Sequence, residues 1–96
     1  MTNQTNDFSF TVNPEATASF HDDGIVILHT GSGRLFSSNP AGARIWRGIE
    51  QRLSLEAIAD EISEEYQIAR GAAREDTVRF LAALEQNTLI QREAVS

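Results

Sequence analysis

The chain has 96 residues, enough for one small domain, since domains usually contain about 50–250 residues. With 41% hydrophobic and 23% charged residues, it has the composition of an ordinary globular protein and not of a disordered or fibrous chain. A domain of this size leaves little room for a deep catalytic cavity, so the length favours a binding module over an enzyme.

The charge balance disfavours two classes of partner. Eight arginines and no lysine stand against 14 acidic residues, which gives a formal net charge of −6. Proteins attract nucleic acids and anionic membrane surfaces largely through lysine and arginine. We therefore expect neither a nucleic acid nor a membrane as the partner.

Few features of the sequence bear on its location. The chain contains no cysteine, which excludes disulfides, thiol nucleophiles and cysteine-ligated metals. The first seven residues are polar and lack the apolar segment of a signal peptide. No apolar run approaches the roughly 18 residues that span a bilayer. These observations predict a cytoplasmic protein.

Both ends of the chain are predicted to lie outside the folded domain. Residues 1–14 are interpreted as a flexible N-terminal tail, in which alternating Phe8, Phe10 and Val12 fit a short extra strand or a segment that covers one face. Residues 93–96 are expected to fray. The residues between them, 15–92, should form one domain.

Three short apolar runs predict three antiparallel strands, at Ala16–His21, at residues 25–30 and at Arg34–Ser38. They are separated by Asp22-Asp23-Gly24 and Gly31-Ser32-Gly33, which suit tight hairpin turns because glycine tolerates positive φ angles. The middle run is apolar at both odd and even positions, so both faces of the sheet are expected to be at least partly covered.

Three helices should follow the strands. Asn39 is a suitable N-cap, and Pro40 can occupy the first helical position without losing a hydrogen bond. Ser54 is expected to cap a second helix, and the third and longest helix is predicted at about residues 71–87. Helical periodicity places the following residues on buried sides: Gly42, Ile45, Trp46 and Ile49; Leu55, Ile58, Ala59, Ile62 and Tyr66; Ala73, Thr77, Phe80, Leu81, Leu84 and Thr88. Leu89 and Ile90 should pack back onto the domain.

The predicted fold class is therefore α+β, with a three-stranded antiparallel β-meander followed by three α-helices.

No group of residues predicts catalysis, a cofactor or a metal centre. His21 and His29 could bind a metal together with Asp22 or Asp23, but two histidines without a third spaced ligand are more typical of a surface. Gly31-Ser32-Gly33 lacks the third glycine of a dinucleotide loop, and the chain lacks the lysine of a phosphate loop. We therefore expect no catalytic residues, no cofactor and no metal.

A winged helix-turn-helix that binds DNA also combines three helices with a small sheet. The long helix carries three arginines that could form a recognition face, Arg70, Arg74 and Arg79. Acidic residues interleave with them on the same helix and would repel phosphate, namely Glu75, Asp76 and Glu85. DNA binding is therefore kept only as the alternative function.

Peptide capture by strand addition is a second interpretation of the same elements. If Arg34–Ser38 is an edge strand, its unpaired backbone groups can bind an extended peptide. On the third helix, a flank of small and polar residues adjoins the core through Phe80 and could form a groove; it comprises Ala72, Asp76, Arg79 and Ala83. From the pattern alone, an ordinary solvent-exposed helix face is the favoured interpretation of this flank.

The order of motifs resembles that of PqqD-like proteins. Residues 33–46, GRLFSSNPAGARIW, are similar to that family's strand-to-helix signature, in which a G-x-aromatic strand leads to L-N-x-x-G-x-x-I-W. Further matches follow at the spacing of the family's second and third helices: Leu55-Glu56-Ala57-Ile58, Tyr66, Asp76, Phe80-Leu81 and Leu89-Ile90. The resemblance covers residues 23–90.

The resemblance implies a small winged helix-turn-helix-like domain that acts as a recognition element for ribosomally made, post-translationally modified peptides. Such a domain binds the leader segment of a precursor peptide as a strand added to its third strand, beside the third helix, and presents the precursor to a separate maturation enzyme. By this carry-over, the leader's backbone would pair with Arg34, Leu35, Phe36, Ser37 and Ser38, and its groove would be lined by Asp76, Arg79, Phe80 and Ala83.

Several positions depart from the family pattern. Ser38 stands where leucine is usual, Leu35 where an aromatic is common, and Thr88 where glycine often ends the third helix. Residues 69–71 replace an acidic, proline-bearing helix start. These departures alter helix capping and the shape of the peptide pocket, and they leave the architecture unchanged.

The form G-x-x-x-x-x-N-P-x-G-x-x-I-W is closer to lasso-type members of the family than to quinone-pathway members. The resemblance implies a lasso-peptide leader peptidase or a radical enzyme as the separate maturation enzyme. A monomer or a weak dimer is expected, since an open strand edge permits some self-association. The adaptor and the DNA-binding alternative predict different salt responses, because phosphate contacts weaken steeply with ionic strength and strand addition does not.

Overall fold

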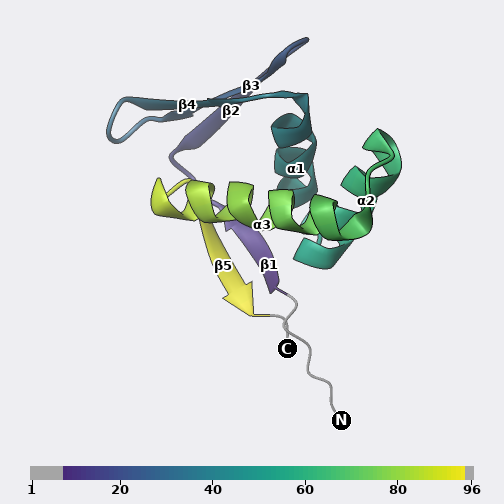
Figure 1. Cartoon of the computed structure of the whole chain (residues 1–96). Helices are drawn as coiled ribbons and strands as arrows, with labels where there is room; N and C mark the ends of the chain where they lie inside the picture. The colour runs from purple at the N-terminus through teal and green to yellow at the C-terminus, as the bar shows by residue number, and fades with distance from the viewer. Residues whose placement is uncertain (1–7, 95–96) are drawn as a thin grey trace.

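The structure, a computed structural model, describes residues 8–94. Along this part of the chain, two antiparallel sheets and three helices form a single α+β unit (Figure 1). The elements, in chain order, are β1 (Phe8–Val12), β2 (Ala16–His21), β3 (Gly24–His29), β4 (Arg34–Ser38), α1 (Pro40–Glu50), α2 (Leu55–Tyr66), α3 (Arg70–Gln86) and β5 (Ile90–Ala94).

The predicted meander is confirmed as a three-stranded sheet with the order β2-β3-β4. Its outer strands have the predicted bounds, and the middle strand begins and ends one residue earlier than predicted. Gly24 begins β3 with a φ angle of 146°, a conformation that other residues rarely adopt. A Cβ atom at Gly24 would also collide with the carbonyl oxygen of Ser38, so glycine is required where β3 and β4 approach closely.

Only one face of this sheet is covered by described elements. Ile25 and Ile27 point inward and are 1% and 0% exposed, whereas Val26 and Leu28 between them are only half-buried. The middle strand is thus buried on one face and half-buried on the other, in keeping with the expectation that both faces are at least partly covered. Apolar sequence alone does not distinguish a covered face from one that meets solvent.

A second, two-stranded sheet joins the two ends of the described chain. β1 pairs antiparallel with β5, from Phe8 opposite Ala94 to Val12 opposite Ile90. The alternating residues 8–12 thus form a strand, which belongs with β5 to a sheet separate from the meander. The prediction of a frayed end is wrong for Glu93 and Ala94, because both belong to β5. The rest of the two predicted ends, residues 1–7 and 95–96, lies outside the described residues.

The helices begin where the capping residues predicted. The Asn39 side chain accepts a hydrogen bond from the backbone N–H of Gly42 (2.9 Å), and the Ser54 hydroxyl accepts one from the N–H of Ala57 (3.2 Å). α3 starts and ends within one residue of its predicted bounds. Within residues 8–94, none of the helices combines the length and the apolarity needed to cross a bilayer.

The core lies between α1, α2, α3 and the inner faces of both sheets. Trp46 is its largest buried side chain, at 1% exposure, and Leu89 and Ile90 pack back as predicted. Two residues assigned to buried helix sides are in fact exposed, Tyr66 and Thr88. Tyr66 is the last residue of α2, and Thr88 follows α3 with a φ angle of 57°, so neither belongs to a helical stripe that faces the core.

Candidate functional site

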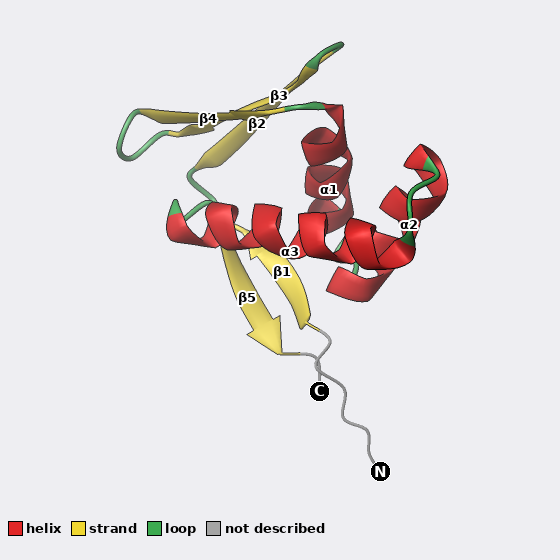
Figure 2. Ribbon diagram, in the orientation of Figure 1, coloured by secondary structure: helices red, strands yellow, loops and turns green. Residues whose placement is uncertain are grey.

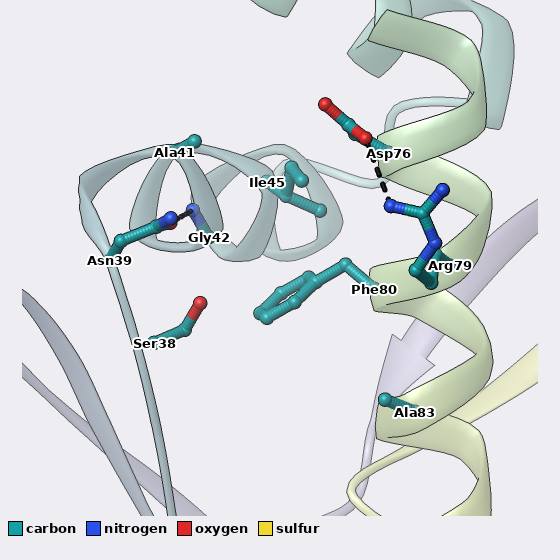
Figure 3. A pocket seen from close by; sticks show the side chains of 9 residues that line it. All are labelled: Ser38, Asn39, Ala41, Gly42, Ile45, Asp76, Arg79, Phe80 and Ala83. Carbon is teal, nitrogen blue, oxygen red and sulfur yellow. Dashed lines mark hydrogen bonds and ion pairs between the residues drawn. The ribbon is translucent and has the colours of Figure 1, made fainter. Parts of the chain in front are cut away.

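A groove of about 390 Å³ lies between the first turns of α1 and the middle of α3, at the end of β4 (Figure 3). Polar and apolar groups line it in nearly equal measure, and its rim on α3 carries two charged side chains. The lining residues are Ser38, Asn39, Ala41, Gly42, Ile45, Asp76, Arg79, Phe80 and Ala83.

Phe80 is the central side chain of the groove. It extends from α3 towards the first turn of α1 (Figure 3) and is only half-buried. Its ring meets that of Phe36 on β4 edge-to-face, with centroids 5.8 Å apart and an interplanar angle of 63°. Phe80 therefore connects α3 to β4, and its partial exposure leaves apolar ring surface for a ligand.

Gly42 permits this close approach on the opposite wall. A Cβ atom there would collide with the Ser38 hydroxyl and would lie 3.1 Å from Cε1 of Phe80. The Asn39 cap holds the first turn of α1, and with it Gly42, directly after β4. Glycine at this position therefore lets the first turn of α1 lie close to Ser38 and Phe80.

The charged rim consists of one ion pair on a single helix. Arg79 Nη1 lies 3.1 Å from Asp76 Oδ1, three residues earlier, and both side chains are more than half exposed. Exposed pairs of this kind contribute about 0–1 kcal/mol, so either charge can exchange its partner for a ligand group at little cost.

Side chains of β4 alternate between the groove and the opposite face of the sheet. Phe36 and Ser38 face α3 and α1. Arg34 shares their side, and its guanidinium donates to Asn87 Oδ1 (3.4 Å) just beyond the end of α3. Leu35 and Ser37 are exposed on the other face. The groove therefore receives side chains from every second residue of β4.

Backbone hydrogen bonds at the tip of the β3–β4 hairpin indicate which way each peptide group points. The carbonyl of His29 accepts from the N–H of Gly33 (2.8 Å), so the backbone groups of His29 face β4. The next N–H, that of Thr30, donates to the carbonyl of Glu15 (2.9 Å), on the side of β2. Backbone groups alternate sides along a strand, so every second residue of β3, counted from His29, bonds to β4.

This alternation identifies the free backbone groups of β4. In the β3–β4 register, the residues opposite that alternate set of β3 are Arg34, Phe36 and Ser38, whose N–H and C=O groups are therefore used within the sheet. The backbone groups of Leu35 and Ser37 point to the other edge, where no strand pairs within residues 8–94. β4 thus offers an open edge beside the groove.

The structure brings most of the predicted site residues together. Ser38, Asp76, Arg79, Phe80 and Ala83 line the groove, and Phe36 contacts it through Phe80. The remaining three lie next to it: Arg34 reaches the end of α3, and Leu35 and Ser37 present backbone groups at the edge. Ala72 of the predicted flank is not a lining residue.

The contribution of α1 was missed by sequence reasoning. Asn39, Ala41, Gly42 and Ile45 line the groove, although the sequence pattern had assigned Gly42 and Ile45 to the core stripe. The available signal was the capping sequence itself, because a helix that starts directly after a strand has to place its first turn beside the end of that strand.

The arginines that suggested a DNA-recognition helix are paired with acids. Arg70 bonds to Asp60 and Glu56, and Arg74 Nε lies 2.7 Å from Glu56 Oε2, so both arginines connect α3 to α2. The hydrogen bond and the charge of Asp60 raise the pKa of Arg70 above its ordinary value. Arg79 pairs with Asp76 as described, and a phosphate would have to compete with carboxylates at all three positions.

The two histidines lie at opposite ends of the β2–β3 hairpin, since His21 stands opposite Gly24 and His29 opposite Ala16. His29 Nε2 lies 3.8 Å from Glu15 Oε1, and its Nδ1 accepts from the backbone N–H of Ser32 (3.1 Å). The two histidines are therefore too far apart to bind one metal ion together with Asp22 or Asp23. No cluster of three candidate ligands occurs in the described part of the chain.

Comparison with known proteins agrees with this architecture. Residues 24–90 match the family model of coenzyme PQQ synthesis protein D (PqqD). No curated protein sequence matches the chain significantly. A solved structure of TbiB1 in complex with the TbiA(beta) leader peptide is 30% identical, with a TM-score of 0.79 over 88% of this chain and 99% of that chain.

A second solved structure, lasso peptide synthetase B1 complexed with the leader peptide, is 25% identical and also has a TM-score of 0.79, over 86% of this chain and 98% of that chain. The family match covers well over half of the sequence and agrees with the resemblance found in its motifs. The chain belongs to the PqqD family.

Proposed function

We propose that this protein is a non-catalytic adaptor, which captures the leader segment of a ribosomally made precursor peptide and presents it to a separate maturation enzyme. The observation that carries the proposal is the open edge of β4 beside a groove into which the half-buried ring of Phe80 projects. The two similar solved structures support it, since both are complexes with a leader peptide.

The leader would bind as a fourth strand of the β2-β3-β4 sheet. Leu35 and Ser37 would exchange backbone hydrogen bonds with it, because their N–H and C=O groups face the free edge. Arg34, Phe36 and Ser38 belong to the site through their side chains, which face α3 and the groove.

Side chains of the bound leader would alternate, and every second one would point into the groove. Phe80 and Ala83 would contact its apolar side chains, and Asp76 and Arg79 would pair with its polar or charged groups. Capture of this kind requires no reacting group. Three of the polar side chains in the groove also have structural partners, since Asn39 caps α1 and Asp76 pairs with Arg79.

The partner and the location follow from this role. A lasso-type pathway is favoured, because one similar structure is described as a lasso peptide synthetase B1. The maturation enzyme would then be a leader peptidase, with a radical enzyme as the other candidate. A ribosomally made precursor is met where it is synthesised, so we place the adaptor in the cytoplasm. Residues 15–92 would contain the complete recognition site.

A two-dimensional amide NMR titration with the leader of the precursor encoded beside this gene tests the proposal. Shifts should concentrate on residues 34–38 and 76–83, and a scrambled leader of equal composition should leave them unchanged. Affinity should vary little with salt, whereas a DNA-binding protein would lose affinity steeply. Absence of shifts with the cognate leader, or steep salt dependence with DNA as the better ligand, would overturn the proposal.

A further inference from the structure

The three-stranded sheet has a second open edge, which β2 forms at the other end of the strand order from β4. In Figure 2 the hairpin of β2 and β3 rises at the top of the view, with its tip pointing away from the three helices. Within residues 8–94, no strand pairs with the outer side of β2. An unpaired edge strand is a template for a further strand, and its residues decide which strand fits.

Backbone hydrogen bonds at the start of β2 identify its free groups. The N–H of Thr30 donates to the carbonyl of Glu15 (2.9 Å), so the backbone groups of Glu15 face β3. Every second residue from Glu15 therefore bonds to β3, and the residues between them face the open edge. The residues with backbone groups at this edge are Ala16, Ala18 and Phe20. The N–H of Ala16 is already used, because it donates to the carbonyl of Asn13 (2.8 Å).

This edge lacks the features that usually prevent strands from pairing between molecules. Edge strands are commonly protected by lysine or other charged residues, by proline or by a bulge. β2 contains no proline, lysine, arginine or acidic residue, and it pairs with β3 without a bulge over residues 16–21. Two of its residues at the open edge are alanines, whose small side chains permit close approach. The edge of β2 is therefore chemically open to another strand.

A strand with the sequence of β2 itself fits this edge. Two copies that pair antiparallel about a twofold axis at Ala18 place this residue opposite its counterpart. On either side of the axis, Thr17 then stands opposite Ser19, Ala16 opposite Phe20, and Glu15 opposite His21. These cross-strand pairs are complementary: two hydroxyls, a small and a large apolar side chain, and an acid with an imidazole.

The same register also brings the free backbone groups together. The two Ala18 residues would exchange both of their N–H···O=C bonds, and the N–H of Phe20 would donate to the carbonyl of Ala16 on either side. The bond from Ala16 to Asn13 is left intact. A register shifted by one residue would oppose free groups to groups that already bond to β3, so the pairing is specific.

We propose that two copies of this chain pair through β2 to form a continuous six-stranded sheet. The edges of β4 lie at its two ends, so both leader sites stay open, and the inference does not depend on the proposed function. The dimer is weak, because one pair of strands covers less than the roughly 800 Å² on each partner of a stable interface. Two copies of net charge −6 also repel each other.

Sedimentation equilibrium of the full chain tests the proposal, at about 0.15 M salt to screen the repulsion between copies. With rising concentration, the average mass of the wild type should increase from one chain to two. Ala18→Pro removes the N–H at the centre of the pairing and no bond within the sheet, so it should remain a single chain. Leu35→Pro is the matched control, because it makes the same change at the edge of β4 and should still dimerise.

A single introduced cysteine tests the register. The chain has no cysteine, so a disulfide formed by Ala18→Cys can only join the two copies at this position. The paired Cα atoms would lie about 5.5 Å apart, within the range of a disulfide. Mild oxidation should form the covalent dimer at least about tenfold faster than in Ala72→Cys, which places the thiol on an exposed part of α3.

A wild-type chain that stays single at every concentration would overturn the proposal. So would a dimer that Ala18→Pro retains, or equal rates of oxidation in the two cysteine variants, since either result would place the interface elsewhere. If Ala18→Pro unfolds, Thr17→Arg/Ser19→Arg replaces it, because like charges then stand opposite each other across the axis. Failure of the wild type to bind the leader would refute the proposed function and leave this dimer unaffected.

Discussion

Replacement of Phe80 by alanine tests the groove most directly. The variant loses the edge-to-face contact with Phe36, which contributes about 0.5–1.5 kcal/mol, and the burial of part of the ring. A fully buried Phe→Ala change costs about 3–5 kcal/mol, so this half-buried ring should cost less, about 1–3 kcal/mol of folding stability. Because Phe80 would anchor the interface, its removal should also weaken leader binding by about 1–3 kcal/mol, which raises Kd about 5- to 150-fold.

The control for Phe80→Ala has to lose stability without touching the groove. Phe20→Ala meets this need, because Phe20 is also half-buried against the core and lies under the guanidinium of Arg47, 4.0 Å from the ring centroid. Circular-dichroism melts measure the stability of both variants, and calorimetry measures leader affinity well below each melting temperature. A folded Phe80→Ala that binds like wild type, or a Phe20→Ala that loses as much affinity, would refute the role of Phe80.

Three further substitutions follow from the geometry. Leu35→Pro removes an N–H that faces the open edge, so leader affinity measured by calorimetry should fall about 2- to 12-fold while stability is retained. If Leu35→Pro and Leu35→Ala bind the leader equally well, the leader binds elsewhere. Gly42→Ala adds a Cβ against the Ser38 hydroxyl and should weaken leader binding in the same assay, whereas Gly71→Ala, which meets open space, should not. Equal affinities of the two variants would show that the space left by Gly42 is not needed for the leader. Thr88→Gly relieves a φ angle of 57° and should raise the free energy of unfolding in urea by about 0.5–1 kcal/mol; an unchanged midpoint would show that this conformation stores no strain.

Local signals in the sequence predicted the fold well. The caps at Asn39 and Ser54 depend on neighbours three residues away, and both are present where the sequence placed them. The strands bounded by glycine turns likewise match to within one residue. Such features depend on the conformational preferences of a few adjacent residues, which the sequence displays directly.

Features that depend on distant partners were not predictable in the same way. The pairing of β1 with β5 joins segments about 80 residues apart, as in the contact of Thr11 with Gln91, and no local pattern encodes that choice. Thr88 has the helical spacing of a buried residue, but α3 ends at Gln86 in a turn where the N–H of Leu89 bonds to the carbonyl of Leu84. The family's glycine at this position was the better indicator.

The candidate site lies between these two cases. Helical periodicity placed Phe80 beside the flank of α3, and the meander placed β4 at an edge. The pattern alone favoured an ordinary exposed helix face, and the resemblance to PqqD-like proteins was needed to make these residues a candidate site. The role of α1 required knowledge of how closely Gly42 approaches Ser38 and Phe80, which is a property of tertiary packing. Sequence periodicity also could not tell which peptide groups of β4 are free, because that depends on the hydrogen-bonding register with β3.

Specificity for one leader cannot come from the open edge itself. The backbone groups of Leu35 and Ser37 would accept any extended peptide, since main-chain hydrogen bonds are the same for every sequence. Selection among peptides therefore has to lie in the groove, where Gly42 leaves space beside Ser38 and Phe80 presents part of its ring. Because exposed ion pairs hold charges weakly, Asp76 and Arg79 can tune that choice by pairing with leader charges of either sign. Exchange of groove residues between family members should transfer leader preference, whereas exchange of β4 edge residues should not.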